Sequence, residues 1–100
     1  MAVAVPVFAD SLGDTQRLIK RGDYAQALAS VNAQLAETPD EAKARFLKGV
    51  ILTETNQSDD AIAVFTKLTE DYPEMPEPYN NLAVLYARQK LYDKARMALE

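Results

Sequence analysis

The sequence contains no histidine and no cysteine among its 100 residues. Without histidine, a Ser-His-Asp triad, a Cys-His pair and a histidine-ligated metal ion are all impossible. The absence of cysteine excludes disulfides, thiolate nucleophiles and zinc-cysteine sites, and it leaves the redox compartment open. The three glycines, Gly13, Gly22 and Gly49, are too scattered for a phosphate-binding loop.

Carboxylates are also poorly placed for chemistry. The pairs Asp59-Asp60 and Glu70-Asp71 are adjacent in sequence, so on a helix the members of each pair point in different directions. No spacing typical of a calcium-binding EF-hand is present. We therefore predict that the chain is not an enzyme and has no catalytic, cofactor-binding or metal-binding residues.

The net charge of −4 lies entirely in the second half of the chain, where nine acidic residues outweigh five basic ones between Glu54 and Glu100. This balance argues against nucleic acid, which requires a basic stripe, and against adhesion to anionic lipid. The apolar run of residues 1–9 is too short to span a bilayer, which takes about 20 apolar residues. We therefore expect no nucleic-acid partner and no membrane span.

The run of residues 1–9, MAVAVPVFA, has two interpretations. Val7 and Ala9 are small residues spaced as at a signal-peptidase site, so the run resembles the end of a signal peptide, and the mature protein would then be periplasmic or secreted. Alternatively, the run is an apolar N-terminal tail that covers the end of the fold, in a cytoplasmic protein.

The rest of the chain repeats a pattern at a fixed interval. The recurring sets are Ala27, Ala61 and Ala95; Val31, Phe65 and Leu99; Gly22, Asn56 and Lys90; and Pro39 and Pro73. The shared period of 34 residues is typical of a helical solenoid.

These residues resemble the unit of the tetratricopeptide repeat (TPR) family, in which a Leu-Gly or Leu-Ala pair and a Tyr or Leu precede an alanine, an aromatic residue and a proline. The third copy matches best, with Tyr79, Leu82, Ala83, Tyr86, Tyr92, Ala95 and Leu99. The second copy departs from the family at Arg45 and Lys48, which stand at places that are usually apolar. The resemblance covers roughly residues 10–100 and implies an all-α solenoid of about six antiparallel helices in a right-handed superhelix.

The period divides residues 10–100 into a degenerate first repeat at about 8–41, a second at 42–75 and a truncated third at 76–100. Within them, apolar spacing and turn residues predict helices over 11–21, 23–37, 41–54, 58–71, 77–89 and 91–100. Gly22 is predicted to end a helix in the left-handed conformation, and Ser58 or Asp59 to cap one. We expect Gly49 at a close helix contact, and the tyrosines Tyr72, Tyr79, Tyr86 and Tyr92 in packing.

The resemblance also implies a concave groove, lined by the first helix of each repeat, that holds a peptide or helix of a partner. The candidate groove residues are Phe46, Leu47, Val50, Asn80, Asn81, Val84 and Arg88, with Leu12, Gln16, Ile19 and Thr53 beside them. Phe46 and Leu47 could equally be core residues. Val50 and Val84 stand where the subclass that clamps a C-terminal carboxylate has asparagine, so we expect a partner with aliphatic anchors instead.

We therefore predict a protein-protein interaction scaffold. Two alternatives stay open: a structural module that self-assembles into homo-oligomers, because Ala95, Met97 and Leu99 lack a partner helix, and the docking domain of a larger protein that continues past Glu100.

Overall fold

The structure, a computed structural model, describes residues 11–100 and contains within that range six α-helices and no strand. The helices are α1 (Ser11–Arg21), α2 (Tyr24–Glu37), α3 (Ala42–Glu54), α4 (Ser58–Asp71), α5 (Glu77–Arg88) and α6 (Tyr92–Leu99). Their ends fall within about one residue of the predicted ones. The prediction of an all-α helical repeat is confirmed, whereas the predictions for residues 1–9 lie outside the described residues.

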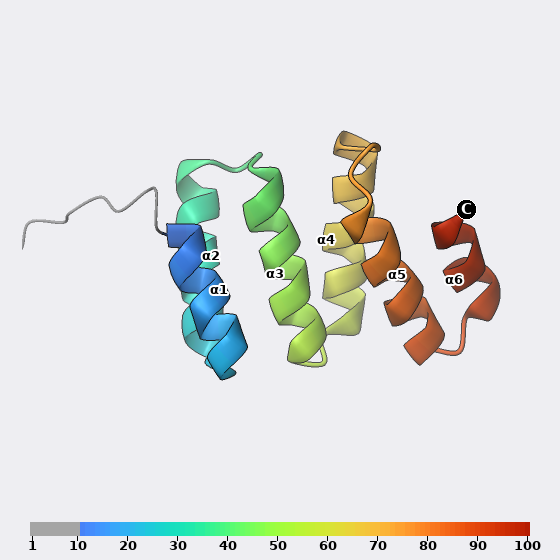
Figure 1. Ribbon diagram of the computed structural model, residues 1–100, viewed down its shortest axis with the longest axis horizontal. Helices are drawn as coiled ribbons and strands as arrows, with labels where there is room; N and C mark the ends of the chain where they lie inside the picture. The colour runs from blue at the N-terminus through green and yellow to red at the C-terminus, as the bar shows by residue number, and fades with distance from the viewer. Residues whose placement is uncertain (1–10) are drawn as a thin grey trace, which may run out of the picture.

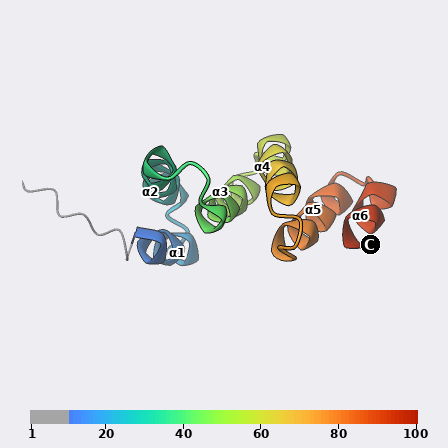
Figure 2. The same cartoon turned by 90° about the horizontal axis from the view of Figure 1, so that it is seen from above.

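The helices pair as antiparallel hairpins that stack along one axis (Figure 1). The hairpins α1–α2, α3–α4 and α5–α6 make the most extensive contacts, followed by the pairs α2–α3 and α4–α5 that join them. Helices α1, α3 and α5 lie toward one side of the row, and α2 and α4 toward the other (Figure 2). The result is an elongated slab of 55 × 26 × 17 Å. No helix in the described part of the chain is both long and apolar enough to cross a membrane.

Each hairpin turns at a residue with a positive φ angle. These residues are Gly22 at 79°, Asn56 at 62° and Lys90 at 61°, which occupy the same position in successive repeats. The amide of the residue after each corner donates to a carbonyl five residues earlier at 2.8 Å: Asp23 to Leu18, Gln57 to Leu52 and Leu91 to Tyr86. This is the Schellman pattern, which satisfies the last carbonyls of a helix. The predicted left-handed corner at Gly22 is confirmed, and it recurs in all three hairpins.

The N-terminal cap of α4 differs from the prediction. Helix α4 begins at Ser58 itself, its N-cap residue is Gln57, and no side chain caps it. The backbone of Gln57 instead accepts a 2.9 Å hydrogen bond from the Ala61 amide. The predicted cap by Ser58 or Asp59 is therefore wrong, because the preceding corner brings the chain directly into the helix.

Most of the buried apolar residues form two clusters, one at each junction between hairpins. The first contains the buried residues Ala27, Val31, Ala44, Leu47 and Ile51. The second contains Leu52, Ala61, Phe65, Leu82 and Leu85. Because each cluster draws side chains from two consecutive hairpins, a hairpin is stabilised by its neighbours as well as by its own pairing.

Gly49 lets α3 and α4 approach closely. A Cβ atom at this position would lie 2.5 Å from the Phe65 ring, which is closer than real Cβ contacts. Phe65 itself is 0% exposed. The predicted close contact at Gly49 is confirmed. The absence of a side chain at Gly49 leaves room for the Phe65 ring.

Three of the four tyrosines that were predicted to pack make contacts within the fold, and the fourth is largely exposed. The Tyr72 hydroxyl donates to the Asp40 carbonyl at 2.9 Å, and the Tyr79 hydroxyl to the Pro73 carbonyl at 3.0 Å. Tyr86 packs against the second cluster. Tyr92 is 63% exposed, so its predicted packing role is wrong.

Candidate partner-binding groove

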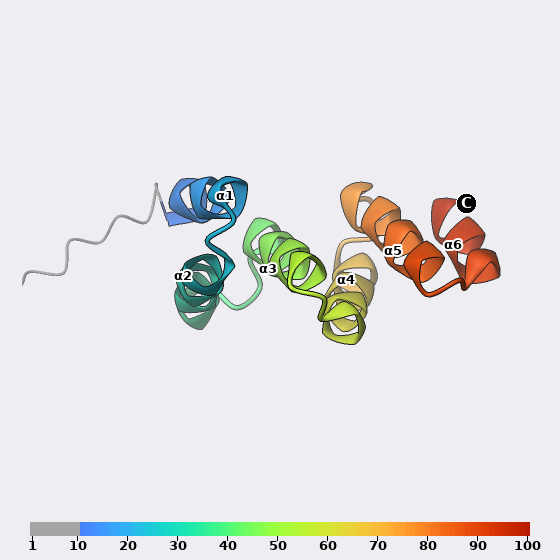
Figure 3. The ribbon, with the colours of Figure 1, turned by 90° about the horizontal axis from the view of Figure 1, so that it is seen from below.

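Helical spacing places most of the predicted groove residues on one face each of α1, α3 and α5. An α-helix turns about 100° per residue, so residues three or four apart share a face. Because α1, α3 and α5 lie toward the same side of the molecule (Figure 3), these faces follow one another along its length. We call this surface the odd-helix face and define it by Leu12, Gln16, Ile19, Phe46, Val50, Asn80, Val84 and Arg88.

Leu47 does not belong to this face. It is 7% exposed and packs in the first cluster with Val31 and Ile51. Its position about 100° around α3 from Phe46 turns it toward α2. The prediction of Leu47 as a groove residue is therefore wrong, and the alternative that it is a core residue is confirmed. Asn81, its counterpart in the next repeat, is half-buried rather than exposed.

Phe46 and Val50 form the apolar centre of the odd-helix face. Both are half-buried, and both pack against the second cluster. The Phe46 ring also meets the Phe65 ring, with centroids 5.6 Å apart and planes tilted by 57°. Phe46 is thus partly a core residue and partly a surface one, and its ring contact holds this apolar surface in a fixed position.

Helix α5 is the most accessible part of the face. Val84 is 49% exposed, and Asn80 and Arg88 are exposed one turn to either side of it. An aliphatic side chain is thereby flanked by an amide on one side and a guanidinium on the other. This arrangement suits a partner that presents an apolar anchor between polar groups.

The other residues named beside the groove contribute less. Thr53 is 9% exposed, and its hydroxyl donates to the Gly49 carbonyl at 2.8 Å, so it is engaged within α3. Leu12 and Ile19 are half-buried against the first cluster, and Gln16 is exposed. The odd-helix face is therefore less exposed to solvent at its α1 end than at its α5 end.

Charges of alternating sign border the odd-helix face. Lys20, Glu54 and Arg88, which occupy equivalent places in the three repeats, are exposed at the ends of α1, α3 and α5. Lys43 and Glu77 are exposed at the opposite ends of α3 and α5. A segment that crosses from one helix to the next thus meets charges of opposite sign, which can fix its register.

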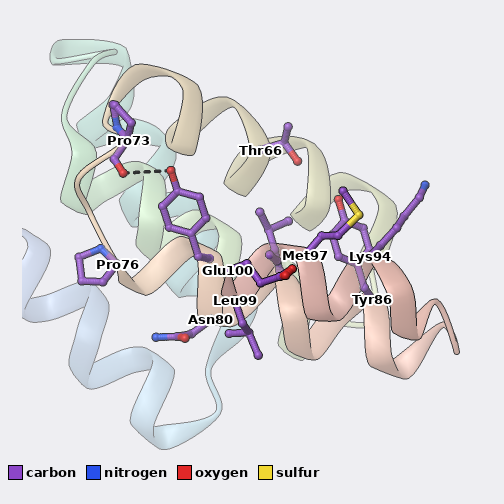
Figure 4. Close-up of a pocket in the computed structure, with 12 residues that line it drawn as sticks. Thr66, Pro73, Pro76, Asn80, Tyr86, Lys94, Met97, Leu99 and Glu100 are labelled. Carbon is purple, nitrogen blue, oxygen red and sulfur yellow. Dashed lines mark hydrogen bonds between the residues drawn. The ribbon is translucent and has the colours of Figure 1, made fainter.

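Two hollows lie beside the odd-helix face, and the larger one shares Asn80 with it. One, of about 730 Å³, is lined by residues of α4, α5 and α6, including Tyr79, Tyr86 and Leu99 (Figure 4). The other, of about 370 Å³, lies among α2, α3 and α4. Neither hollow is lined by Phe46, Val50 or Val84, so the apolar strip at the centre of the odd-helix face lies outside both of them.

The hollow among α2, α3 and α4 was not predicted from the sequence, although two residues that line it depart from the repeat pattern. Arg45 and Lys48, the residues that depart from the repeat pattern, both line this hollow. Among residues 11–100 no group of acidic, histidine or cysteine side chains could hold a metal ion.

Comparisons with known proteins agree with this architecture. The sequence model of the tetratricopeptide repeat family matches residues 16–76 and again residues 54–100. No curated protein matches the chain. Among solved structures, MamA, residues 41 to the end, from Desulfovibrio magneticus RS-1 is similar over 93% of this chain, with a TM-score of 0.84 and 24% identity. An ArsTM double mutant of MamA RS-1 is similar over 92% of it, with a TM-score of 0.81 and 24% identity.

This chain covers 52% of each of those two structures, so it spans about half their length. At 24% identity the likeness establishes the fold alone. The family model, by contrast, matches most of the chain in two overlapping segments, in agreement with the period of the sequence and the recurring corners. The chain therefore belongs to the tetratricopeptide repeat family.

Proposed function

We propose that this chain is a protein-protein interaction scaffold whose odd-helix face binds a peptide segment or helix of a partner protein through aliphatic anchors. The main supporting observation is Val84, which is 49% exposed at the centre of α5 between Asn80 and Arg88. A large aliphatic side chain this accessible, beside the half-buried Val50 and Phe46, gains free energy when a partner covers it.

The strip form of the surface favours a partner segment over a small molecule. Ligand pockets bury most of a small molecule in a concave cavity, whereas the odd-helix face is open and runs along successive helices. Recognition of an extended or helical segment by apolar anchors uses this geometry. Membership of the repeat family supports a protein partner in general.

Paired baits test the proposal. The chain and its Val84→Asp variant are used to capture partners from the host's envelope and cytoplasmic fractions, with identification by mass spectrometry. Because Val84 is exposed, the variant should stay folded, as circular dichroism can verify. Ala29→Asp is the matched control, since Ala29 is exposed on α2, away from the odd-helix face.

A partner retained by the chain and by Ala29→Asp but lost from Val84→Asp supports the proposal. A partner held equally by all three contradicts it. The fraction that yields the partner also tests the prediction, made from residues 1–9, of a periplasmic or secreted protein against the cytoplasmic alternative.

A second candidate function is self-assembly through α6. Tyr92, Met97 and Leu99 are 63%, 70% and 61% exposed, which leaves an apolar surface on this helix. Burial of such a surface between copies would stabilise a homo-oligomer. Sedimentation equilibrium at high concentration should then show oligomers that Leu99→Asp disrupts, and a strict monomer would count against this candidate.

A further inference from the structure

The two hollows occupy equivalent positions in consecutive repeats. Five residues of the smaller hollow have counterparts one repeat later in the larger one: Pro39 and Pro73, Arg45 and Tyr79, Lys48 and Leu82, Ala63 and Met97, Val64 and Ala98. The fold thus forms a hollow where the second helix of one repeat meets both helices of the next. The two differ in the chemistry of their walls.

The smaller hollow combines an apolar wall with cations. Leu35, Ala63 and Val64 provide aliphatic surface, and Arg45, Lys48 and Lys67 provide the positive charges. At the equivalent places the larger hollow has Tyr79 for Arg45 and Leu82 for Lys48. The repeat pattern accepts apolar residues at both places, so the fold itself does not require these two cations.

Two of the three cations already have partners. The Arg45 guanidinium lies 2.8 Å from an Asp71 carboxylate oxygen, and its centre is 5.9 Å from the middle of the Tyr72 ring. The Lys67 ammonium lies 3.5 Å from Asp71 and 3.9 Å from Glu70. Arg45 is therefore held in place, with only 12% of its side chain exposed. The positive charge of Lys67 is already paired with two acidic residues of its own helix.

Lys48 is different, because within residues 11–100 it makes no ion pair. Its side chain is half-buried against the apolar wall. The ion pairs of Arg45 and Lys67 with Glu70 and Asp71 leave Lys48 as the one lining cation without an acidic partner among the described residues. A partly desolvated ammonium is stabilised by an anion that can approach it from the open side.

We infer that this hollow is a second protein-binding site, which takes an acidic residue flanked by aliphatic residues in a peptide segment of a partner. The aliphatic side chain packs on Leu35, Ala63 and Val64, and the carboxylate pairs with the Lys48 ammonium. A single carboxylate can pair with the one lining cation that makes no ion pair among the described residues. The volume of about 370 Å³ holds a few side chains and not a whole domain.

The site is separate from the odd-helix face. Lys48 is two residues from both Phe46 and Val50, so it lies about 200° around α3 from each of them. The inference thus goes beyond the proposed function and can fail or succeed independently of it. If both hold, two segments can be bound at once on opposite sides of α3.

Nuclear magnetic resonance titration of the folded chain tests this site. The probes are the peptides acetyl-Leu-Glu-Leu-amide and acetyl-Leu-Gln-Leu-amide, which differ only in charge at the central residue. We expect the glutamate peptide to shift the amide signals of Leu35, Ala63 and Val64, and to bind about fivefold more tightly than the glutamine peptide at low salt. High salt should reduce this preference because it screens the ion pair.

Four variants define the outcome. Lys48→Met keeps the aliphatic stem and should abolish the preference for glutamate, while Lys48→Arg should retain it. Lys43→Met, an equal change of charge at an exposed residue elsewhere on α3, should have no effect. Val84→Asp should also leave the binding unchanged. Equal binding of the two peptides, signal shifts confined to other residues, or absence of binding would each overturn the inference.

Discussion

The hairpins α3–α4 and α5–α6 have the same backbone pattern but differ in how their residues are buried. Phe65 of α4 is 0% exposed, whereas Leu99, its counterpart in α6, is 61% exposed. The central hairpin is packed on both sides, by α2 and by α5. Helix α6, by contrast, makes extensive contacts only with α5. Burial of a residue in this fold is thus decided by the neighbouring repeat more than by the residue type.

A second contrast concerns how residues pair within each hairpin. The positions occupied by Gly49 and Phe65 in the central hairpin are occupied by Ala83 and Leu99 in the third, and by Thr15 and Val31 in the first. As the residue of the first helix becomes larger, the residue of the second becomes smaller. In the central hairpin this inverse relation has a direct cause, because the Phe65 ring fills the space that a side chain at Gly49 would take.

The largest predicted effect removes the central ring. Phe65→Ala should lower the free energy of unfolding by about 3–5 kcal/mol, because it leaves a cavity in the second cluster. Leu99→Ala at the equivalent exposed position should cost about 0.5 kcal/mol or less. Urea denaturation followed by circular dichroism measures both. Similar losses for the two variants would contradict the contrast between the hairpins.

A next prediction tests the shared volume. Gly49→Ala should destabilise the protein by about 1–3 kcal/mol, since the new Cβ atom lies 2.5 Å from the Phe65 ring. The double variant Gly49→Ala with Phe65→Leu reproduces the pair found in the third hairpin. We expect the double variant to be more stable than the sum of the single changes implies, by about 1 kcal/mol in a double-mutant cycle. Strict additivity would show that the two positions do not share one space.

A smaller effect concerns the corners. Lys90→Gly should stabilise the protein by about 0.5–1 kcal/mol, because glycine adopts a φ of 61° without the steric cost that lysine meets. Asn56→Gly in the central hairpin should gain less, since asparagine tolerates the left-handed region. Thermal unfolding curves compare the two. A loss of stability in Lys90→Gly would indicate that the lysine side chain compensates for its backbone conformation.

The last prediction concerns how the stability of the folded protein depends on pH. The hydrogen bond from Arg45, together with the charge of Lys67, holds the pKa of Asp71 below its ordinary value of 3.8. A lowered pKa in the folded state means that the contribution to stability is present above about pH 4 and disappears as the pH falls through the folded-state pKa. The third hairpin has Tyr79 in place of Arg45 and lacks this pair.

Asp71→Asn should therefore lower the unfolding temperature at pH 6 and have a smaller effect at pH 3. Asp93→Asn, which removes the Asp93–Arg96 contact within α6, serves as the control. An effect of Asp71→Asn that stays constant between these two pH values would argue against the ion pair as its cause.

Much of the fold could be predicted from the sequence because its boundaries depend on local chemistry. Gly22 and Asn56 mark corners that need a positive φ, and Pro73 interrupts the helical pattern. The N-cap residue of α4 is harder to predict, since no side-chain cap marks Gln57 as that residue. Periodicity alone could not separate Leu47 from Phe46, because adjacent residues on a helix differ by only about 100° and both are apolar.

The candidate surfaces depended more on the structure. Val84 and Arg88 could be placed on one face from their spacing, but only the structure distinguishes the exposed Val84 from the half-buried Val50. The hollow that Lys48 lines draws on three helices, so a linear pattern could indicate an unusual residue there and not the cavity around it.

The thinness of the slab, 17 Å along its shortest axis, has a consequence for amide hydrogen exchange. A molecule this thin has no deep centre that all helices share, so one hairpin can open while the others keep their contacts. Protection from exchange should therefore decrease in steps along the long axis, from α3 and α4 toward the amides of α6. The slowest-exchanging amides would then report the stability of the central repeat and not that of the whole chain.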